Sequence, residues 1–493
     1  MAVLAETPLV ADPPPAPTRL SGQHKLILAL LLGTQFMLTV DFSILNVALP
    51  DLGADLAFSK ANLQWVATAF ALPAAGFTLL FGRFGDLFGR RRLFLGGMGL
   101  LAAASLLGGL TDSQQLIIVA RVLQGLATAM ATPAALSLLT TAFPEGALRD
   151  KALGLNGALR DKALGLNGAL LSGGFTVGAL LGGVLTDVLT WRWAFLLNVP
   201  IALLVLFVAP AVIKESRTPD KVKLDIPGAI TVTAGLLALT YGFTAAGTEG
   251  WSDPVALGSL AAAVLLLTAF YLIERKAVAP LASVRILNRP SVKWGNVGGF
   301  LAFGMETAVV FMMTLYLQEV LHYSAMATGL AFAVPGVAAV LAGLGAPKLI
   351  GRFGSRNVLV GGLLVQAVAN LPLLLLDVEK GWFGLVLAVL GIGFYGNVTA
   401  IVAFNVTATS GLPNEEQGLA TGLTTLTQQI GFTLGIPLLS SMVALGASGH
   451  QDSGSAAALL DGIHLGVGVD VAVTAAGLAL IATFLRSARQ PSA

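Results

Sequence analysis

Long apolar runs, separated by short charged or turn-forming segments, recur along almost the whole chain of 493 residues. A helix needs about 20 consecutive apolar residues to cross the hydrocarbon core of a bilayer. An all-helical membrane protein with fourteen transmembrane helices is therefore predicted. The predicted spans are 26–49, 63–82, 93–110, 115–142, 164–187, 193–213, 226–246, 254–273, 292–320, 325–346, 357–376, 382–405, 418–445 and 463–485.

Charged residues support this interpretation and predict the orientation. They make up only 11% of the chain, whereas a soluble protein carries about 25%. If the N-terminus is cytoplasmic, 24 of the 28 Lys and Arg residues fall in cytoplasmic segments, and only Lys60, Arg192 and Lys380 fall on the other side. Because cytoplasmic loops are enriched in Lys and Arg, we expect both termini in the cytoplasm and a multi-pass protein of the cell's plasma membrane.

Longer polar segments follow the sixth and the eighth predicted spans, which indicates a 6+2+6 arrangement. A short sequence echo supports two related halves, since Gly82-Arg83-Phe84-Gly85 after span two returns as Gly351-Arg352-Phe353-Gly354 after span ten. Transporters built from such repeats place one site between the halves. The predicted parts are a disordered cytoplasmic tail 1–24, a six-helix bundle 25–213, a linker 214–290 with extra helices at about 226–246 and 254–273, a six-helix bundle 291–486, and a cytoplasmic tail 487–493.

An eleven-residue segment, 146–156, is repeated without change at 157–167. Eleven residues are close to three helical turns, so the insertion keeps the helical phase. A recent duplication or a sequence artefact explains it better than a functional repeat does, and no activity is assigned to it.

Several classes of function are disfavoured by what the sequence lacks. It has no cysteine, no two histidines at the HExxH spacing and no Gly-Lys pair for a phosphate-binding loop. No metal site, cofactor or ATP site is therefore expected. The predicted spans contain no nucleophile–base cluster, which argues against an enzyme, and the loops are too short for a typical receptor domain. A formal net charge of +2 gives no reason to expect nucleic acid as a partner.

The segment between spans two and three carries the most specific motif, Gly82-Arg83-Phe84-Gly85-Asp86-Leu87-Phe88-Gly89-Arg90. It resembles the loop signature of the major facilitator superfamily. Further short motifs extend the resemblance along nearly the whole chain: Asp41–Pro50, Leu63–Val66, Arg121–Gly125, Trp191–Phe195, Asn198–Pro200, Tyr316–Gln318 and Thr427–Gly431. Together with fourteen spans, they are similar to the fourteen-helix drug:proton antiporter family. The resemblance implies the major facilitator fold and a cytoplasmic gate formed by Gly82, Asp86, Gly89 and Arg90.

Two opposite charges, Asp41 in span one and Arg121 in span four, lie inside apolar runs. Each costs about 2.5–3.5 kcal/mol in a bilayer on insertion scales. Counted at 1.5 Å per residue, both stand about 9–12 Å from the same membrane surface, so they can pair. One interpretation is a static structural ion pair. The other is that Asp41 carries the coupling proton and Arg121 tunes its proton affinity, a role that the family resemblance also implies.

A further acidic residue, Glu306, lies deep in span nine. It could bind a cationic substrate, serve as a second proton site, or simply be packed in its protonated form. We group it with Asp41 and Arg121 as a candidate for proton coupling. Asp470 lies at a similar depth in span fourteen but sits among valines, and it ranks below Glu306.

Span five carries Gly174, Gly178 and Gly182 at a spacing of four, which puts them on one helix face and permits close packing. This resembles the antiporter motif of the exporters, although Ala179 stands where that motif usually has a proline. Simple helix packing explains the glycines as well as a gating role does. The candidates for a substrate pathway are Gln124, Gly178, Gly182, Asn397 and Gln428.

These observations predict a proton-coupled secondary transporter that exports hydrophobic drugs, antibiotics or related small molecules by alternating access. The departure at Ala179 keeps open a proton-coupled importer of a small metabolite with the same fold. The expected partners are a small-molecule substrate, protons and the lipid bilayer, and a monomer is favoured.

Overall fold

The computed structural model describes residues 22–58, 60–142, 174, 177–215, 225–277, 280, 284–409, 414–448 and 455–485. Every regular element in these ranges is a helix. Backbone groups inside a bilayer must be hydrogen-bonded within the protein, and a helix does this along its own length. The repeated segment 146–167 and most of the two predicted tails lie outside the described residues.

The described helices overlap the predicted spans, but residues 164–173 of predicted span five lie outside the described part of the chain. The α-helices are α1 Gly22–Asp55, α2 Lys60–Phe88, α3 Arg90–Leu110, α4 Gln114–Ala142, α7 Trp193–Leu196, α8 Asn198–Val212, α9 Ile226–Thr248, α10 Pro254–Glu274, α11 Val284–Leu287, α12 Pro290–Leu315, α13 Ala325–Ala331, α14 Ala333–Phe353, α15 Ser355–Asn370, α16 Phe383–Thr409, α17 Asn414–Ala447 and α18 Ala456–Phe484. A π-helix, η1 Tyr316–Val320, and two 3₁₀-helices, η2 Leu371–Leu375 and η3 Lys380–Trp382, complete them.

Twelve helices in the described part of the chain are long and apolar enough to cross a membrane. A shorter apolar stretch of α2, Trp65–Thr78, and a shorter apolar helix, Val177–Val188, lie where spans two and five were predicted. The chain is therefore a multi-pass membrane protein.

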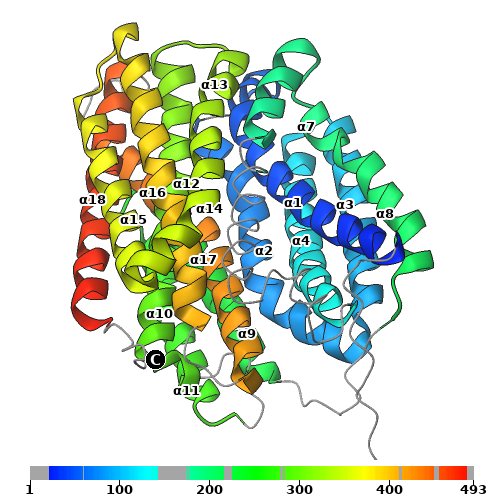
Figure 1. Cartoon of the computed structure of the whole chain (residues 1–493). Helices are drawn as coiled ribbons and strands as arrows, with labels where there is room; N and C mark the ends of the chain where they lie inside the picture. The colour runs from blue at the N-terminus through cyan, green and yellow to red at the C-terminus, as the bar shows by residue number, and fades with distance from the viewer. Residues whose placement is uncertain are drawn as a thin grey trace, which may run out of the picture.

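The helices pack as two groups that lie side by side (Figure 1). The N-terminal group comprises α1–α4, α7 and α8, with a core around Phe94, Met98 and Leu101. The C-terminal group comprises α12–α18 with η1–η3, and its core includes Met305 and Met312. Apolar side chains fill the space between helices in each group, so each group holds together by its own packing.

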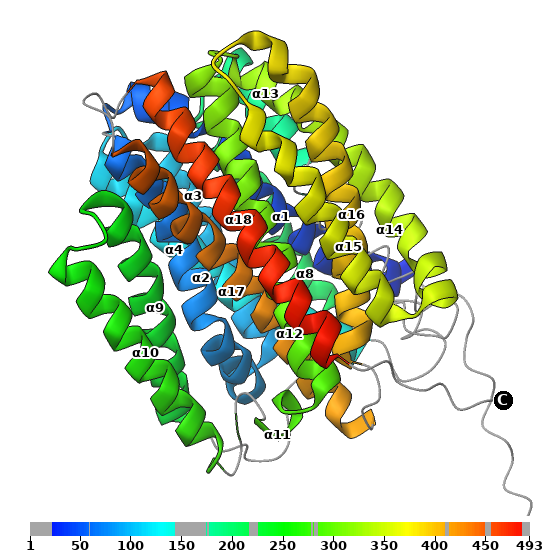
Figure 2. The same ribbon diagram turned by 90° about the vertical axis from the view of Figure 1, so that its left-hand side faces the viewer.

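Helices α9 and α10 form an antiparallel pair that packs against both groups, next to α2 and α17 (Figure 2). The hydroxyl group of Thr233 on α9 donates to the carbonyl oxygen of Gly76 on α2. Farther along α9, Gly247 packs against the backbone of Ser441 on α17. Asp225 and Asp253 cap the two helices, each followed closely by a proline, which explains why the helices begin where they do.

The two groups also touch directly near α13, at the top of Figure 1. The side-chain amide of Gln318 on η1 donates to the carbonyl oxygen of Val47 on α1 over 3.2 Å. A Cβ added to Gly183 would lie 2.6 Å from the carbonyl oxygen of Ala325 on α13, and one added to Gly329 would lie 2.8 Å from that of Ala179. This end, which we call the α13 end, is thus closed by backbone-to-backbone packing at glycines.

Candidate functional site

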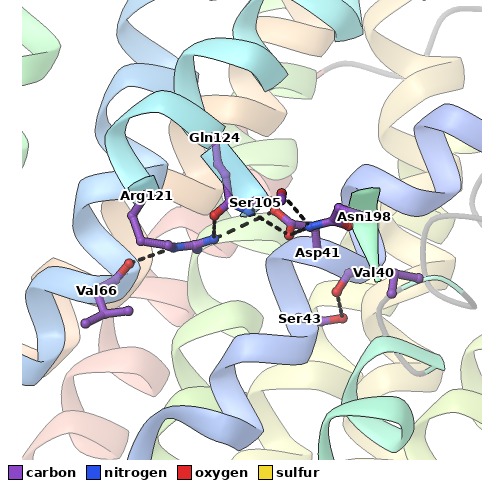
Figure 3. A network of polar contacts seen from close by, with 8 residues as sticks. All are labelled: Val40, Asp41, Ser43, Val66, Ser105, Arg121, Gln124 and Asn198. Atoms are coloured by element: carbon purple, nitrogen blue, oxygen red, sulfur yellow. Dashed lines mark hydrogen bonds and ion pairs between the residues drawn. The ribbon is translucent and has the colours of Figure 1, made fainter. Parts of the chain in front are cut away.

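Asp41 and Arg121 form an ion pair inside the N-terminal group (Figure 3). The Arg121 Nη1 atom lies 3.7 Å from Asp41 Oδ2, and each residue is only 1% exposed. The contact agrees with the equal depth estimated from the sequence. At 3.7 Å the charges attract without a direct hydrogen bond, and Asp41 Oδ2 has no hydrogen-bond partner.

The guanidinium group of Arg121 is held by other partners as well. Its Nε donates to the carbonyl oxygen of Val66 on α2 over 2.9 Å, and its Nη1 donates to Gln124 Oε1 over 2.9 Å. The ring of Phe70 lies under the guanidinium carbon, with 4.3 Å to the ring centroid. Arg121 is thus held by three partners other than Asp41.

Three buried polar side chains complete the network around Asp41. Its Oδ1 accepts hydrogen bonds from the amides of Asn198 on α8 and of Gln124, the latter over 3.3 Å. Ser105 Oγ on α3 accepts from both amides, over 3.3 Å and 2.9 Å respectively. The network thus joins α1, α2, α3, α4 and α8. Gln124, which the sequence suggested for the substrate pathway, is fully buried in it.

Sequence reasoning did not identify Ser105 or Asn198 as members of this site. Asn198 was noted only as part of a short motif, and Ser105 drew no attention because a serine in a transmembrane helix is common. Buried amides need partners, so the position of Asn198 at the start of an apolar helix was the one available signal.

A row of phenylalanine rings runs from this network into the C-terminal group. Phe42, next to Asp41, lies with its ring centroid 5.9 Å from that of Phe70 and 5.4 Å from that of Phe432 on α17. Phe432 in turn lies 5.1 Å from Phe303 on α12. These are ordinary edge-to-face or tilted aromatic contacts. They connect the two groups halfway between the ends of their helices.

Gly178 and Gly182 pack against the backbone of α1, at the turn that carries Asp41. A Cβ on Gly178 would collide with the hydroxyl group of Ser43, and one on Gly182 would collide with the carbonyl oxygen of Ile44. The predicted glycine face is thus a close helix contact, and it supports the helix on which Asp41 stands.

The predicted cytoplasmic gate lies at the turn between α2 and α3. Gly89 has φ +111°, a conformation that favours glycine. The carboxylate of Glu215, after α8, fills the space beside it and accepts hydrogen bonds from the backbone N–H groups of Arg91 and Arg92. Glu215, which the sequence did not single out, therefore caps α3. The side chain of Asp86 lies outside the described part of the structure, so the role of Asp86 and Arg90 in a cytoplasmic gate stays a prediction.

Glu306 and Asn397 lie in the C-terminal group, away from Asp41. Glu306 is 4% exposed, and neither of its carboxyl oxygens has a hydrogen-bond partner. The side-chain amide of Asn397 donates to the carbonyl oxygen of Ala302 and to Gln366 Oε1. Asn397 thus links neighbouring helices in this conformation. Gln428 on α17 is half-buried.

Two acidic residues in the last turns of α1, at the α13 end, have pKa values shifted in opposite directions. Hydrogen bonds from the Trp191 indole and from Arg192 lower the pKa of the exposed Asp55. Partial desolvation and the nearby charges of Asp187 and Glu319 raise the pKa of Asp51. The two charges that act on Asp51 come from the helix Val177–Val188 and from η1 of the C-terminal group.

Comparisons with known proteins agree with this architecture. The chain is 37% identical over 431 residues to the cephamycin export protein CmcT of Amycolatopsis lactamdurans, which covers 86% of this chain and 85% of that protein. It is 36% identical over 472 residues to the puromycin resistance protein pur8 of Streptomyces alboniger, with 92% and 89% covered.

Among solved structures, an auto-inhibited POT family peptide transporter matches with a TM-score of 0.66 at 18% identity, over 95% of this chain and 99% of that one. At this identity the match concerns the fold alone. The model of the Major Facilitator Superfamily matches residues 31–436. With its helical bundle and two relatives above 35% identity, the chain belongs to the Major Facilitator Superfamily of membrane transporters.

Proposed function

We propose that this protein exports a hydrophobic small molecule of the antibiotic class across the plasma membrane in exchange for protons. The named relatives support export, since they are a cephamycin export protein and a puromycin resistance protein. The single structural observation that carries the proton coupling is the buried ion pair of Asp41 and Arg121.

We also propose the number of transmembrane helices, their arrangement and their orientation. The chain has fourteen transmembrane helices in a 6+2+6 arrangement, with both termini in the cytoplasm. The segments 25–213 and 291–486 form two bundles that rock about a site between them, and α9 and α10 belong to the linker. In this orientation the α13 end faces outside, so the described conformation is closed to the outside.

Asp41 is the proton carrier in this mechanism. Its Oδ2 faces Arg121 but accepts no hydrogen bond, so a proton can bind there without displacing a partner. Protonation removes the negative charge and weakens the attraction to α4. Because Val66 and Gln124 still hold Arg121, the guanidinium group stays in place and again favours the charged form of Asp41 when the proton leaves.

The phenylalanine row provides the apolar surface for the substrate. Phe42 and Phe432 come from different helix groups and are half-buried, and their rings are in contact beside Asp41. A substrate that separates these rings would act on the helix that carries the proton site. Gln428 is one helical turn from Phe432 on α17 and supplies a polar group at the same surface.

The test uses everted membrane vesicles from a host that expresses the protein, with puromycin and lincomycin as probes. Respiration acidifies the vesicle interior, and an exporter then accumulates the probe there while protons leave. We expect accumulation that collapses with a protonophore and that is lost in Asp41→Asn. Asp461→Asn, an exposed carboxylate on α18, is the matched control and should keep it.

Two outcomes would contradict parts of this proposal. Proton-driven accumulation only in right-side-out vesicles would identify an importer and overturn the proposal. Unchanged accumulation in Asp41→Asn, at equal protein content in the membrane, would remove Asp41 as the carrier.

A further inference from the structure

A second pair of buried acidic side chains lies in the C-terminal group. Glu306 stands near the middle of the long helical segment formed by α12 and η1, and Asp470 stands halfway along α18. They are 4% and 0% exposed. Both therefore lie deep within the hydrocarbon region that these helices cross, on different helices from Asp41 and Arg121.

Asn370 stands between the two acids. Its Nδ2 donates to Asp470 Oδ2 over 3.0 Å. Its Oδ1 lies 3.3 Å from the point where a Cβ on Gly393 would be, and Glu306 Oε1 lies 3.8 Å from the same point. The Asn370 amide and the Glu306 carboxyl group thus border one small space beside α16, which Gly393 leaves free of a side chain.

The hydrogen-bonding capacity of this cluster is largely unused. Both oxygens of Glu306, Oδ1 of Asp470 and Oδ1 of Asn370 have no hydrogen-bond partner and are fully buried. All of these atoms are acceptors, so they cannot satisfy one another unless one of the carboxyl groups carries a proton. None of these four atoms is a donor, and a carboxylic acid O–H supplies one.

No positive side chain compensates the two acids in the described residues. The other titratable side chains described on α12, η1, α15, α16 and α18 stand toward the helix ends or the surface: Lys293, Tyr316, Glu319, Arg356, Tyr395, Asp461 and His464. Two unpaired carboxylates buried this deeply would each cost several kcal/mol. A bound proton removes that cost.

We propose that Glu306 and Asp470 form a second proton-binding site, in which Asn370 positions Asp470 and the two carboxyl groups hold at least one proton in this conformation. The site deepens the proposed proton coupling, and its part in transport rests on that proposal. Its proton occupancy is a separate property that can be measured without any substrate.

The backbone changes its helix type beside this site. The α-helix α15 ends at Asn370 and continues as the 3₁₀-helix η2. Helix α12 also changes to a π-helix, η1, but only ten residues after Glu306. Such changes within a span are frequent at functional sites. Loss of the proton would alter the Asn370–Asp470 hydrogen bond at the residue where α15 changes form.

The experiment is infrared difference spectroscopy of the full-length protein in liposomes, titrated with pH in potassium chloride. The wild type should show a carbonyl-stretch band of protonated carboxylic acid at neutral pH that shifts in deuterated water. Glu306→Gln and Asp470→Asn should each change the band and its titration midpoint, because the groups titrate as a pair. The double variant should lose this component, whereas Asp461→Asn should keep it.

Asn370→Leu tests the positioning role, since it should shift the frequency of the band while the acids remain. A wild type without the band at neutral pH, or a double variant with the wild-type spectrum, would overturn the proposal. So would a band that disappears when potassium is replaced by sodium or appears only in choline chloride, because the site would then bind a metal cation. Loss of transport in Asp41→Asn does not bear on any of these readouts.

Discussion

At the scale of single residues, the surroundings of Asp41 determine how it can hold a charge. Arg121 supplies attraction at 3.7 Å, while Asn198 and Gln124 supply the hydrogen bonds to its Oδ1. A buried ion pair is stable only when further hydrogen bonds satisfy it. Asn198, from α8, is therefore as much a part of the site as the cation is.

Asn198→Ala should destabilise the protein by about 1–3 kcal/mol, because a buried carboxylate loses a hydrogen-bond donor. It should also move the pH midpoint of transport upward, since the charged form of Asp41 loses support. Thermal unfolding in detergent and the pH profile of probe uptake measure the two effects. Asn405→Ala is the control, because its amide bonds only to its own helix, and its pH profile should match the wild type.

The lowered pKa of Asp55 predicts that the stability of the protein depends on pH. Its folded-state pKa lies below the unfolded value of about 3.9 because Trp191 and Arg192 donate hydrogen bonds to it. Its contribution is thus fully present above pH ~4 and is lost as the pH falls through the folded-state pKa. Asp55→Asn should lower the melting temperature at pH 7, and the difference from the wild type should shrink at pH 3. A constant difference would contradict this explanation.

The raised pKa of Asp51 predicts the opposite dependence of stability on pH. Its raised pKa means that ionisation costs folding free energy above the folded-state value, and the cost disappears as the pH falls toward about 3.9. Asp51→Asn should therefore raise the melting temperature at pH 7 and have little effect at pH 3. Measured beside Asp55→Asn, it gives a matched pair of variants at the same end of α1. A lower melting temperature for Asp51→Asn at pH 7 would contradict a destabilising repulsion of Asp51 by Asp187 and Glu319.

The sequence could reveal charges but not their neutral partners. Asp41, Arg121 and Glu306 stood out because an ionisable side chain inside an apolar run is costly. Asn198, Ser105 and the capping role of Glu215 could not be recognised in the same way. Their partners are distant in the sequence. Serine or a loop glutamate carries no signal by itself, and Asn198 offered only its position at the start of an apolar helix.

At the scale of helices, close packing at glycine determines where α1 can stand. The helix Val177–Val188 presents Gly178 and Gly182 directly to the backbone of α1, and Gly183 to that of α13. One short helix therefore contacts both groups. The spacing of four predicted a shared face, but only the structure identifies α1 as its neighbour.

Gly178→Ala should disturb this contact, because the added methyl group would overlap the Ser43 hydroxyl group. Displacing α1 would move Asp41 away from Arg121, so we expect lower proton-driven uptake and a melting temperature lowered by an overpacking cost of about 1–3 kcal/mol. Gly99→Ala, at a position with nothing within 4 Å, is the control. Equal uptake in the two variants would argue against a role for this contact.

The helices themselves were largely predictable, since the length of each apolar run is set by the bilayer. The linker helices were expected at 226–246 and 254–273 and are found at Ile226–Thr248 and Pro254–Glu274. The interruptions at η1 and η2 were not predicted, because a change from α to π or 3₁₀ geometry leaves the apolar pattern intact. The packing of α9 between α2 and α17 was not predicted either, because no sequence repeat marks that position.

At the scale of the whole molecule, we propose that proton binding at Asp41 drives the exchange between two conformations. The α13 end is closed by Gly183, Gly329 and the Gln318–Val47 hydrogen bond. Acidic Asp51 and Glu319 lie near this closure on different helix groups, so we expect protonation of Asp51 to lower their repulsion and to favour closure. In the proposed orientation, protons arriving from outside would then favour the conformation described here.

The most direct measurement compares two modes of transport in proteoliposomes that contain Asp41→Asn. The neutral amide resembles a protonated carboxyl group in size and charge, so the binding of puromycin and its exchange across the membrane at equal pH should persist. Uptake driven by a pH gradient should be lost. Gradient-driven uptake at the wild-type rate, with exchange also intact, would contradict the claim that Asp41 carries the proton.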